Sequence, residues 1–347
     1  MRYFDYSFLE NGLLPANLVN ITNAIWELKT KDSQRKEDHV EIFSSLERIA
    51  IVQSVKGSNE IEGIVTSEER ITQIVNGNSA PLNHNEMEIA GYRDALNMIH
   101  EGYAHMSLSE RLIMELHSIL LSYTGEGGGH YKESDNIIME VGADGQRRVR
   151  FEPVPASDTQ ESMQQLVLAY TEAQSNPNIN RLLLIPCVVL DFLCIHPFSD
   201  GNGRISRLLS LLLLYKNGFD AGKYISFEEQ INNTKPVYYE TLKQSSERWH
   251  EGENSYFPFI EHFLLMLLRC YRELDKRFAV VQGKKVSKKH RVEATVLNSL
   301  MPISKAEICY CLPDVSPTTV EAVLSSMLKN GSIEKIGQAR STKYIRK

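Results

Sequence analysis

The feature of this sequence that most constrains its fold is a short polar run enclosed by two strongly apolar segments. The first apolar segment covers residues 182–195, and the second carries isoleucine and leucine at helical spacing from residue 205 to residue 212. Pro197 disfavours a helical conformation in the residue before it, so the first helix should end where the run begins. The second helix should begin near Asn202, whose side chain can cap it. We therefore expect two buried helices joined by a tight polar turn.

The turn has the sequence His196-Pro197-Phe198-Ser199-Asp200-Gly201-Asn202-Gly203-Arg204-Ile205-Ser206-Arg207. Its glycines fall at a helix N-terminus, where unpaired backbone N–H groups and the positive end of the helix dipole attract phosphate. Arg204 and Arg207 are three residues apart, hence on one helical face, and can bind phosphate oxygens. His196 can accept a proton from a hydroxyl group, and Asp200 offers oxygen ligands of the kind that Mg²⁺ accepts alongside substrate phosphates. These roles fit a phosphoryl-type transfer.

Two other interpretations of the run exist. In one, His196 and Asp200 belong to a helix cap and the arginines make surface ion pairs, although chance rarely supplies all of these residues together. In the other, His196 and Asp200 bind a metal ion for hydrolysis, which leaves the arginines and the glycines unexplained.

The run matches every fixed position of the signature His-Pro-Phe-x-Asp/Glu-Gly-Asn-Gly-Arg-x-x-Arg, and the chain therefore resembles the Fic family. The resemblance implies transfer of AMP from ATP to a Ser, Thr or Tyr hydroxyl of a protein, with release of pyrophosphate. It implies that His196 deprotonates the target hydroxyl and that Asp200 holds Mg²⁺, the expected cofactor, on the α- and β-phosphates.

The same resemblance assigns the remaining positions of the signature. Gly201, Asn202 and Gly203 would form the nest of backbone N–H groups around the phosphates, and Arg204 and Arg207 would clamp the β- and γ-phosphates. Such catalysis depends on positioning and on charge stabilisation more than on covalent chemistry by the protein.

A second motif, Ser58-Asn59-Glu60-Ile61-Glu62-Gly63, resembles the inhibitory motif Ser/Thr-x-x-x-Glu-Gly/Asn of Fic proteins. The resemblance implies that Glu62 pairs with Arg207 and blocks productive placement of the γ-phosphate, because a carboxylate competes with phosphate for the same guanidinium. Glu60 is a weaker alternative, since only Glu62 has the required spacing and the following glycine. A capped or solvated surface helix would be the non-functional interpretation of Ser58 and Glu62. Some relatives with this glutamate remove AMP, and the sequence does not decide between the two directions.

Between the two motifs, residues 125–132 are rich in glycine but lack the Gly-Lys-Ser/Thr ending of a phosphate-binding P-loop. We interpret them as a flexible connection that resembles the Gly-x-Tyr-Arg segment of Fic proteins, with Lys132 where arginine is usual. Strand-like residues 136–141 and 147–151 follow, joined through Gly142-Ala143-Asp144-Gly145, and predict a hairpin. In Fic proteins such a flap adds the backbone of the target as an extra strand. An ordinary surface hairpin is the alternative.

Residues 232–242 resemble a family segment that ends in Tyr-Tyr-x-x-Leu and often lies near the nucleotide base. Tyr239 is the predicted contact on the adenine side of the site. A tyrosine at a helix start can equally be half-buried packing.

Composition agrees with a multi-domain cytoplasmic enzyme of mainly α class. The chain has 347 residues, of which 42% are hydrophobic, and this is enough for sizeable cores. Its apolar runs, such as residues 208–214, are far shorter than the roughly 20 residues that a membrane helix needs. The N-terminus contains acidic residues and does not resemble a signal peptide. The five cysteines form no Cys-x-x-Cys pair and are expected to be reduced and mostly buried.

Charge divides the chain. From residue 284 to residue 347 there are twelve Lys or Arg against five Asp or Glu, whereas the rest of the chain is acidic. We therefore predict an N-terminal helical region over 1–100 that carries the inhibitory motif, an all-helical Fic core with a small hairpin flap over 101–283, and a basic domain over 284–347. Residues 280–289 should form the linker.

Helices near 289–300, 304–311 and 316–330, followed by strands at 333–336 and 342–345, resemble a winged helix-turn-helix. The basic balance favours DNA, but Ser316 opens a recognition helix with no arginine or lysine near its N-terminus, which makes direct base readout poor. A protein partner is the alternative for this domain.

Three classes of function follow. The first is an autoinhibited protein adenylyltransferase that uses ATP, modifies a target protein or itself, and becomes active when the contact between Glu62 and Arg207 is relieved. The second is other chemistry at the same site: AMP removal, transfer of another nucleotide, or, least favoured because Gly201 to Arg204 are kept, phosphate transfer as in Doc-type relatives. The third is a non-catalytic regulator that binds nucleotide or DNA. A homodimer that masks Glu62 would be one form of control.

Overall fold

The computed structural model describes residues 2–141, 145–282, 287–297, 299, 302–312, 315–337 and 342–347. The protein is mainly α-helical with two small sheets, as the sequence predicts. The chain forms two compact units: Met1–Trp26 with Ala50–Cys270, and Glu27–Ile49 with Tyr271–Lys347. The predicted division at residues 100 and 283 is a different partition of the chain and stays a prediction.

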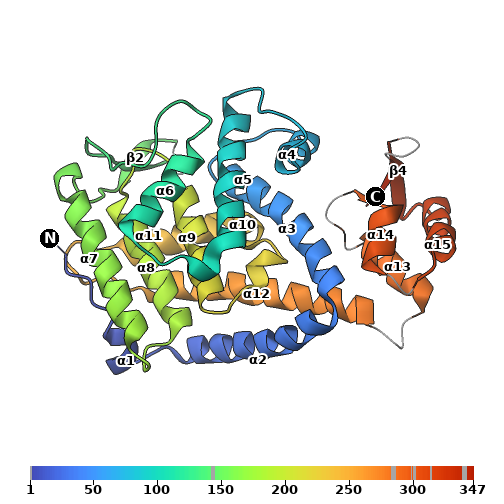
Figure 1. Ribbon diagram of the computed structural model, residues 1–347. Helices are drawn as coiled ribbons and strands as arrows, with labels where there is room; N and C mark the ends of the chain where they lie inside the picture. The colour runs from blue at the N-terminus through green and yellow to red at the C-terminus, as the bar shows by residue number, and fades with distance from the viewer. Residues whose placement is uncertain are drawn as a thin grey trace. The chain divides into compact units, whose positions relative to one another are not determined.

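In chain order the helices are α1 (Phe8–Asn11), α2 (Ala16–Asp38), α3 (Val40–Ile61), α4 (Glu68–Val75), α5 (His84–Gly102), α6 (Glu110–Leu120), α7 (Ala156–Ser175), α8 (Arg181–Ile195), α9 (Asn202–Lys216), α10 (Phe227–Asn232), α11 (Lys235–Ser246), α12 (Phe257–Gln282), α13 (Lys288–Leu297), α14 (Lys305–Cys311) and α15 (Pro317–Lys329) (Figure 1). Three of them, α2, α3 and α12, contribute residues to both units.

Helices α8 and α9 form the centre of the first unit and pack against each other. All of α8 is buried except Arg181 and Leu193, which explains why its sequence is a continuous apolar run rather than an amphipathic pattern. It ends at Ile195, directly before His196 and Pro197, as predicted. The two buried helices therefore fix both ends of the polar turn between them.

The predicted cap of α9 is wrong. Gly201, in a left-handed conformation with φ of +79°, occupies the N-cap position, and Asn202 is the first helical residue. The Asn202 side chain instead turns back to the turn, where it accepts a hydrogen bond from the Phe198 N–H (3.0 Å) and donates one to the Phe198 carbonyl (2.7 Å). An asparagine can serve both groups of one residue because its amide carries a donor and an acceptor.

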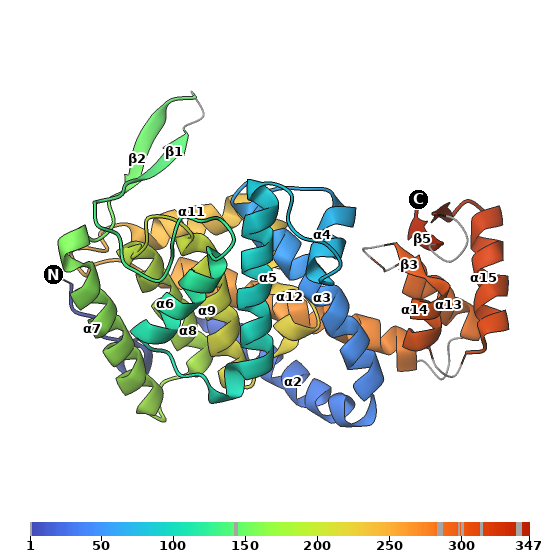
Figure 2. The same ribbon diagram turned by 45° about the horizontal axis from the view of Figure 1, so that its top comes forward.

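Strands β1 (Ile138–Val141) and β2 (Arg147–Phe151) form the predicted antiparallel hairpin. Figure 2 shows them projecting from the helices of the first unit. Of the predicted connection, Gly142, Ala143 and Asp144 lie outside the described residues. No third strand pairs with this sheet in the described part of the chain.

In the second unit, the basic segment forms α13, β3 (Ile303–Ser304), α14, α15, β4 (Ile333–Ile336) and β5 (Lys343–Arg346). The three strands form one antiparallel sheet in the order β3-β5-β4. The three helices and the strands β4 and β5 lie close to their predicted ranges, whereas β3 was not predicted; the assignment as a winged helix-turn-helix stays a prediction. The helices share an apolar core made of Val292, Val296, Ile303, Ile308, Leu312, Val315, Val320, Val323, Leu324, Met327 and Ile333.

The predicted linker over 280–289 is wrong in part. Helix α12 continues to Gln282, and α13 already begins at Lys288, while residues 283–286 lie outside the described residues. The apolar helix pattern that ends near Phe278 is thus followed by one more helical turn. Among the described residues, no helix combines the length and the apolarity that crossing a membrane requires.

The N-terminal segment is held on α8 by a buried carboxylate. Asp191 is fully buried and accepts hydrogen bonds from the hydroxyls of Tyr6 (2.8 Å) and Tyr256 (2.9 Å) and from the indole N–H of Trp249 (2.7 Å). The Arg2 guanidinium lies 4.0 Å from the same group. Burial raises the pKa of Asp191 to about 6, so these donors are what makes a carboxylate tolerable there.

Removing this carboxylate should destabilise the protein strongly. We expect Asp191→Ala to lower the free energy of unfolding by about 3 kcal/mol, because three buried donors lose their acceptor at once. Asp5→Ala, which removes an exposed carboxylate of the N-terminal segment, should lower the free energy of unfolding by less than about 1 kcal/mol. Urea denaturation followed by circular dichroism measures both, and equal losses would contradict the role given to Asp191.

Candidate active site

His196 lies at the C-terminal end of α8 in a left-handed conformation, with φ of 53° and ψ of 59°. This conformation is unfavourable for a residue with a Cβ and persists only where the surroundings impose it. Its Nδ1 lies 3.2 Å from the carbonyl oxygen of Leu193, and since that oxygen can only accept, Nδ1 carries the hydrogen. Nε2 is thereby left with its lone pair.

The backbone around His196 is fixed by Lys132 and Asn136, from the segment before β1. Lys132 donates from its backbone N–H to the carbonyl of Pro197 (2.9 Å) and from Nζ to the carbonyl of Ile195 (3.3 Å). Asn136 accepts from Lys132 Nζ (2.8 Å) and donates to the carbonyl of Phe198 (3.0 Å). The carbonyls on both sides of His196 are thus bonded to one buried lysine, which stabilises the left-handed turn.

His117 of α6 supports the other end of the turn. The Gly129 N–H donates to His117 Nδ1 (3.0 Å), so the ring carries its hydrogen on Nε2 and donates it to the carbonyl of Asp200 (3.2 Å). The ring also stacks on Phe198, with centroids 3.7 Å apart. At Gly128 a Cβ would lie 2.6 Å from the carbonyl oxygen of His117. Gly128 and Gly129, which belong to the segment predicted to be a flexible connection, are therefore packed against α6.

Asp200 and Arg204 form an ion pair of 2.9 Å one helical turn apart. The Arg204 side chain is only 2% exposed and also pairs with Glu88 of α5 at 2.5 Å, whereas the Asp200 carboxylate is 64% exposed. Arg204 is thus already neutralised by two carboxylates. Asp200 is the more accessible partner, at the N-terminus of α9.

Arg207, the second arginine of the run, is buried and bonded to both residues of the upstream motif. Its Nε donates to Ser58 Oγ (2.8 Å), and its Nη2 donates to the Ser58 carbonyl (2.9 Å) and to Glu62 Oε1 (2.8 Å). Burial alone would lower the pKa of Arg207, but the charge of Glu62 raises it above its ordinary value. The structure thus places Glu62, and not Glu60, on this guanidinium; Glu60 accepts a hydrogen bond from Asn232.

The backbone of Glu62 is fixed by the way α3 ends. Gly63 adopts a left-handed conformation with φ of +82°, its N–H bonds to the carbonyl of Glu60, and the Ile64 N–H bonds to the carbonyl of Asn59. This is a Schellman motif, which needs glycine at that position. The presence of glycine directly after Glu62 thus has a structural reason.

A buried network holds α3 in place. Glu228 of α10, with no exposed surface, accepts hydrogen bonds from Ser54 of α3 (2.8 Å) and from Tyr92 of α5 (2.9 Å). At Gly57 a Cβ would approach the backbone of Glu229 to 3.0 Å, so α3 and α10 are in close backbone contact. These contacts hold the helix that carries Glu62 against α10.

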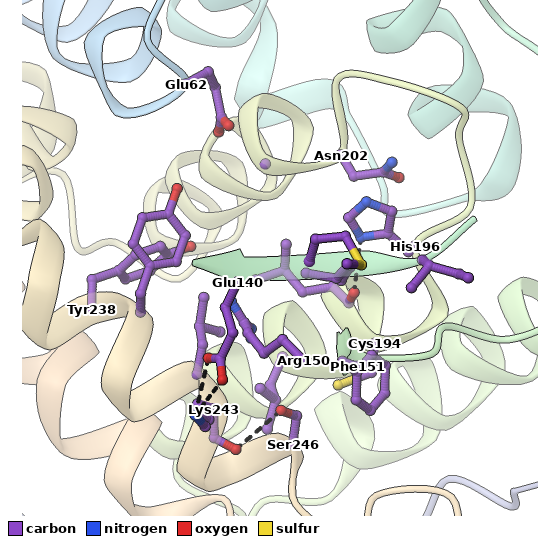
Figure 3. A pocket seen from close by; sticks show the side chains of 18 of the residues that line it. Glu62, Glu140, Arg150, Phe151, Cys194, His196, Asn202, Tyr238, Lys243 and Ser246 are labelled. Carbon is purple, nitrogen blue, oxygen red and sulfur yellow. Dashed lines mark hydrogen bonds and ion pairs between the residues drawn. The ribbon is translucent and has the colours of Figure 1, made fainter. Parts of the chain in front are cut away.

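These groups surround one cavity of about 620 Å³ in the first unit. Figure 3 shows Glu62, Asn202 and His196 at one end, and Glu140, Lys243 and Ser246 at the other. Its predicted lining residues are Glu62, His196, Asp200, Gly201, Asn202, Gly203, Arg204, Arg207 and Tyr239. Ser58 lies behind Arg207 and does not line it.

The wall that faces the α9 N-terminus is aromatic and apolar. Tyr238 and Tyr239 of α11 have ring centroids 5.4 Å apart, and both line the cavity with Leu242 and Ile138. Tyr239 is half-buried and Tyr238 buried. Such a wall can accommodate a flat aromatic ligand.

Mg²⁺ fits this site only together with a ligand. Among the described residues, no group of three or more His, Cys, Asp or Glu side chains could hold a metal ion. Asp200 offers one exposed carboxylate, and Mg²⁺ is commonly held by one or two carboxylates while substrate phosphates and water complete its shell.

His117, Lys132, Asn136 and Tyr238 were not predicted as site residues. The first three act on backbone carbonyls, and no side-chain spacing in a sequence reports such contacts. Tyr238 adjoins the predicted Tyr239. In the sequence, only the helical spacing of α11 would have indicated that Tyr238 also faces the cavity.

Comparisons with known proteins agree on one family. A family model described as Fic/DOC family matches residues 107–214. A Fido domain-containing protein from Dictyostelium discoideum is 24% identical over 145 residues, which cover 42% of this chain and 92% of that protein.

Two solved structures share the fold. A Fic family protein from Desulfovibrio desulfuricans G20 has a TM-score of 0.61 at 18% identity and covers 96% of this chain and 97% of its own. The Fic-1 protein of C. elegans has a TM-score of 0.58 at 17% identity over 76% of this chain and 73% of its own.

The histidine of the turn should titrate far below the ordinary range. Burial, with the charges of Lys132 and Arg150 nearby, lowers the pKa of His196 to about 4. Because the folded pKa lies below the ordinary value, the imidazole stays neutral from about pH 5 upward and takes a proton only as the pH falls through about 4. Proton–nitrogen NMR, assigned with His196→Ala, measures the midpoint; a value near 6.5 would contradict this environment.

Proposed function

Because this chain belongs to the Fic/DOC family, we propose that it is a protein adenylyltransferase held inactive by its own Glu62. The substrates are ATP and a Ser, Thr or Tyr hydroxyl of a target protein, and the products are the AMP-modified protein and pyrophosphate. The observation that carries the proposal is the contact of Glu62 with Arg207 in the cavity that His196 lines. The roles proposed below for individual residues are based on their contacts in this cavity.

In the proposed reaction, Nε2 of His196 takes the proton of the target hydroxyl. The hydroxyl oxygen forms a bond to the α-phosphorus, the bond from that phosphorus to the bridging oxygen breaks, and pyrophosphate leaves. The fixed Nδ1 hydrogen and the lowered pKa of His196 keep the imidazole neutral and correctly oriented for this step at neutral pH.

The nucleotide would lie along the cavity with its phosphates at the N-terminus of α9. Backbone N–H groups of Gly201, Asn202 and Gly203 would bind phosphate oxygens, helped by the helix dipole, and Arg204 and Arg207 would hold the β- and γ-phosphates. Asp200 would hold Mg²⁺, which neutralises phosphate charge when bound. Tyr239, with Tyr238, supports a place for the adenine ring on the aromatic wall.

The hairpin supports a docking role for the target. Strand β1 lines the cavity through Ile138 and Met139, and its only described neighbour is β2. A target backbone pairing with the free edge of β1 would present a hydroxyl to His196, with affinity from main-chain hydrogen bonds rather than from a particular sequence.

The proposed brake is competition between two anions for one guanidinium. Glu62 occupies Arg207 and lies directly over Gly203, where an added Cβ would collide with Oε1. A γ-phosphate at the same place would have to displace the carboxylate. The Glu62 side chain is 32% exposed, which also supports AMP removal as a second candidate, with the carboxylate orienting a water molecule in the cavity.

For the basic segment of the second unit, we propose that the binding partner is a protein rather than DNA. The first turn of α15 exposes Pro317 and Thr318 but no arginine or lysine, and Glu321 pairs with Lys305 at 2.6 Å. Helices that read bases usually present cationic or amide side chains at this end. Strongly salt-dependent binding to duplex DNA would overturn this preference.

Relieving the brake should release transfer. We expect Glu62→Gly, incubated with ATP and Mg²⁺, to gain the mass of AMP on itself or on an added target at least tenfold faster than the wild type, because Arg207 becomes free for the γ-phosphate. Intact-protein mass spectrometry measures the gain.

Two control variants separate the roles of the carboxylate and of the base. Glu60→Gly, two residues away and not bonded to Arg207, should behave as wild type. Adding His196→Ala to Glu62→Gly should abolish transfer and leave ATP binding intact. Equal rates for Glu62→Gly, Glu60→Gly and wild type would refute the brake, and transfer without His196 would refute the base.

A further inference from the structure

Arg150 is a third arginine of the cavity that the family signature does not include. It belongs to β2, lines the cavity, and is shown in Figure 3 between the Glu140–Lys243 pair and Phe151. Its Nε is fully buried and, among the described residues, has no hydrogen-bond partner. An unpartnered buried guanidinium nitrogen is costly, and its place inside a binding cavity suggests that a ligand supplies the partner.

A β-bulge directs Arg150 into the cavity. Ile138 pairs with Phe151 and Met139 pairs with Val149, so Arg150 is the extra residue between them. Bulges re-aim side chains next to active sites, and here the bulge lets both Arg150 and Phe151 line the cavity although they are neighbours in a strand. In a regular strand, neighbouring side chains would point to opposite faces.

Arg150 differs from the other cationic side chains that line the cavity, because those side chains are paired with carboxylates. Arg204 pairs with Glu88 and Asp200, and Arg207 pairs with Glu62. The fourth cation of the lining, Lys243, binds both oxygens of Glu140, at 2.8 and 2.9 Å. Within the described part of the chain, Arg150 is the lining cation that has no carboxylate partner.

We infer that Arg150 binds an oxygen of the α-phosphate of the nucleotide. This inference rests on the proposed function of the cavity as a nucleotide site. Arg150 lines the same cavity as His196 and Tyr239, and its charge lowers the pKa of both groups. In the proposed reaction the α-phosphorus receives the hydroxyl oxygen that His196 deprotonates and stays bonded to the nucleoside, so the α-phosphate must lie within reach of both His196 and the aromatic wall.

The test compares AMP with adenosine, which differ only in the α-phosphate, by isothermal titration calorimetry without any target protein. Arg150→Gln should weaken AMP binding about tenfold or more and change adenosine binding less than twofold, since a hydrogen bond to a charged group is lost. Arg150→Lys, which keeps the charge, should lose less. Arg147→Gln, an exposed arginine of the same strand outside the cavity lining, should bind both ligands as the wild type does.

The outcomes separate this inference from the proposed function. If the wild type binds AMP and Arg150→Gln binds it equally well, or loses adenosine to the same extent, the α-phosphate contact is refuted while the nucleotide site stands. If the wild type binds neither ligand, the nucleotide site itself fails. Thermal unfolding of each variant, expected within about 2 °C of the wild type for this partly exposed position, shows whether the change in binding comes from misfolding.

Discussion

Burial of Arg207 is the constraint on which the site depends. A guanidinium that is 2% exposed needs a charged or strongly accepting partner, since an unpaired buried charge costs about 3–5 kcal/mol. In the absence of nucleotide, Ser58 and Glu62 supply the acceptors. The interaction proposed as a brake therefore also stabilises the buried Arg207, and a phosphate that replaces Glu62 must provide a comparable counter-charge.

The geometry of the turn follows from a second constraint, the left-handed conformation of His196. Two buried helices fix its ends, and side chains from outside the run hold its carbonyls: Lys132, Asn136 and His117. The proposed base is thus oriented by backbone contacts made by residues that do not line the cavity. Such contacts explain how a histidine keeps one tautomer and one orientation at a position where the backbone is strained.

Much of this could be predicted from the sequence, and the failures have physical reasons. The apolar segments and Pro197 predicted the end of α8 at Ile195 and the start of α9 near Asn202. The resemblance of Ser58–Gly63 to a known motif led to the pair Glu62 and Arg207, which lie in contact although 145 residues separate them. Side chains that bind backbone carbonyls produce no recognisable pattern in the sequence, so His117, Lys132 and Asn136 were not predicted as site residues. Asn202 was wrongly predicted to cap α9 because asparagine is equally suited to a helix cap and to bridging a turn through its side-chain amide, and the sequence does not distinguish the two. Arg150 escaped because simple alternation cannot anticipate a bulge.

The central claim is that Glu62 and the γ-phosphate compete for Arg207. The most direct test is a pair of crystal structures, wild type and Glu62→Gly, each with Mg²⁺ and an ATP analogue that cannot be cleaved. The account predicts that in the variant the γ-phosphate lies within hydrogen-bond distance of the Arg207 guanidinium, whereas in the wild type Glu62 keeps that position and the γ-phosphate lies elsewhere. A wild-type structure with the γ-phosphate on Arg207 and Glu62 displaced would contradict it.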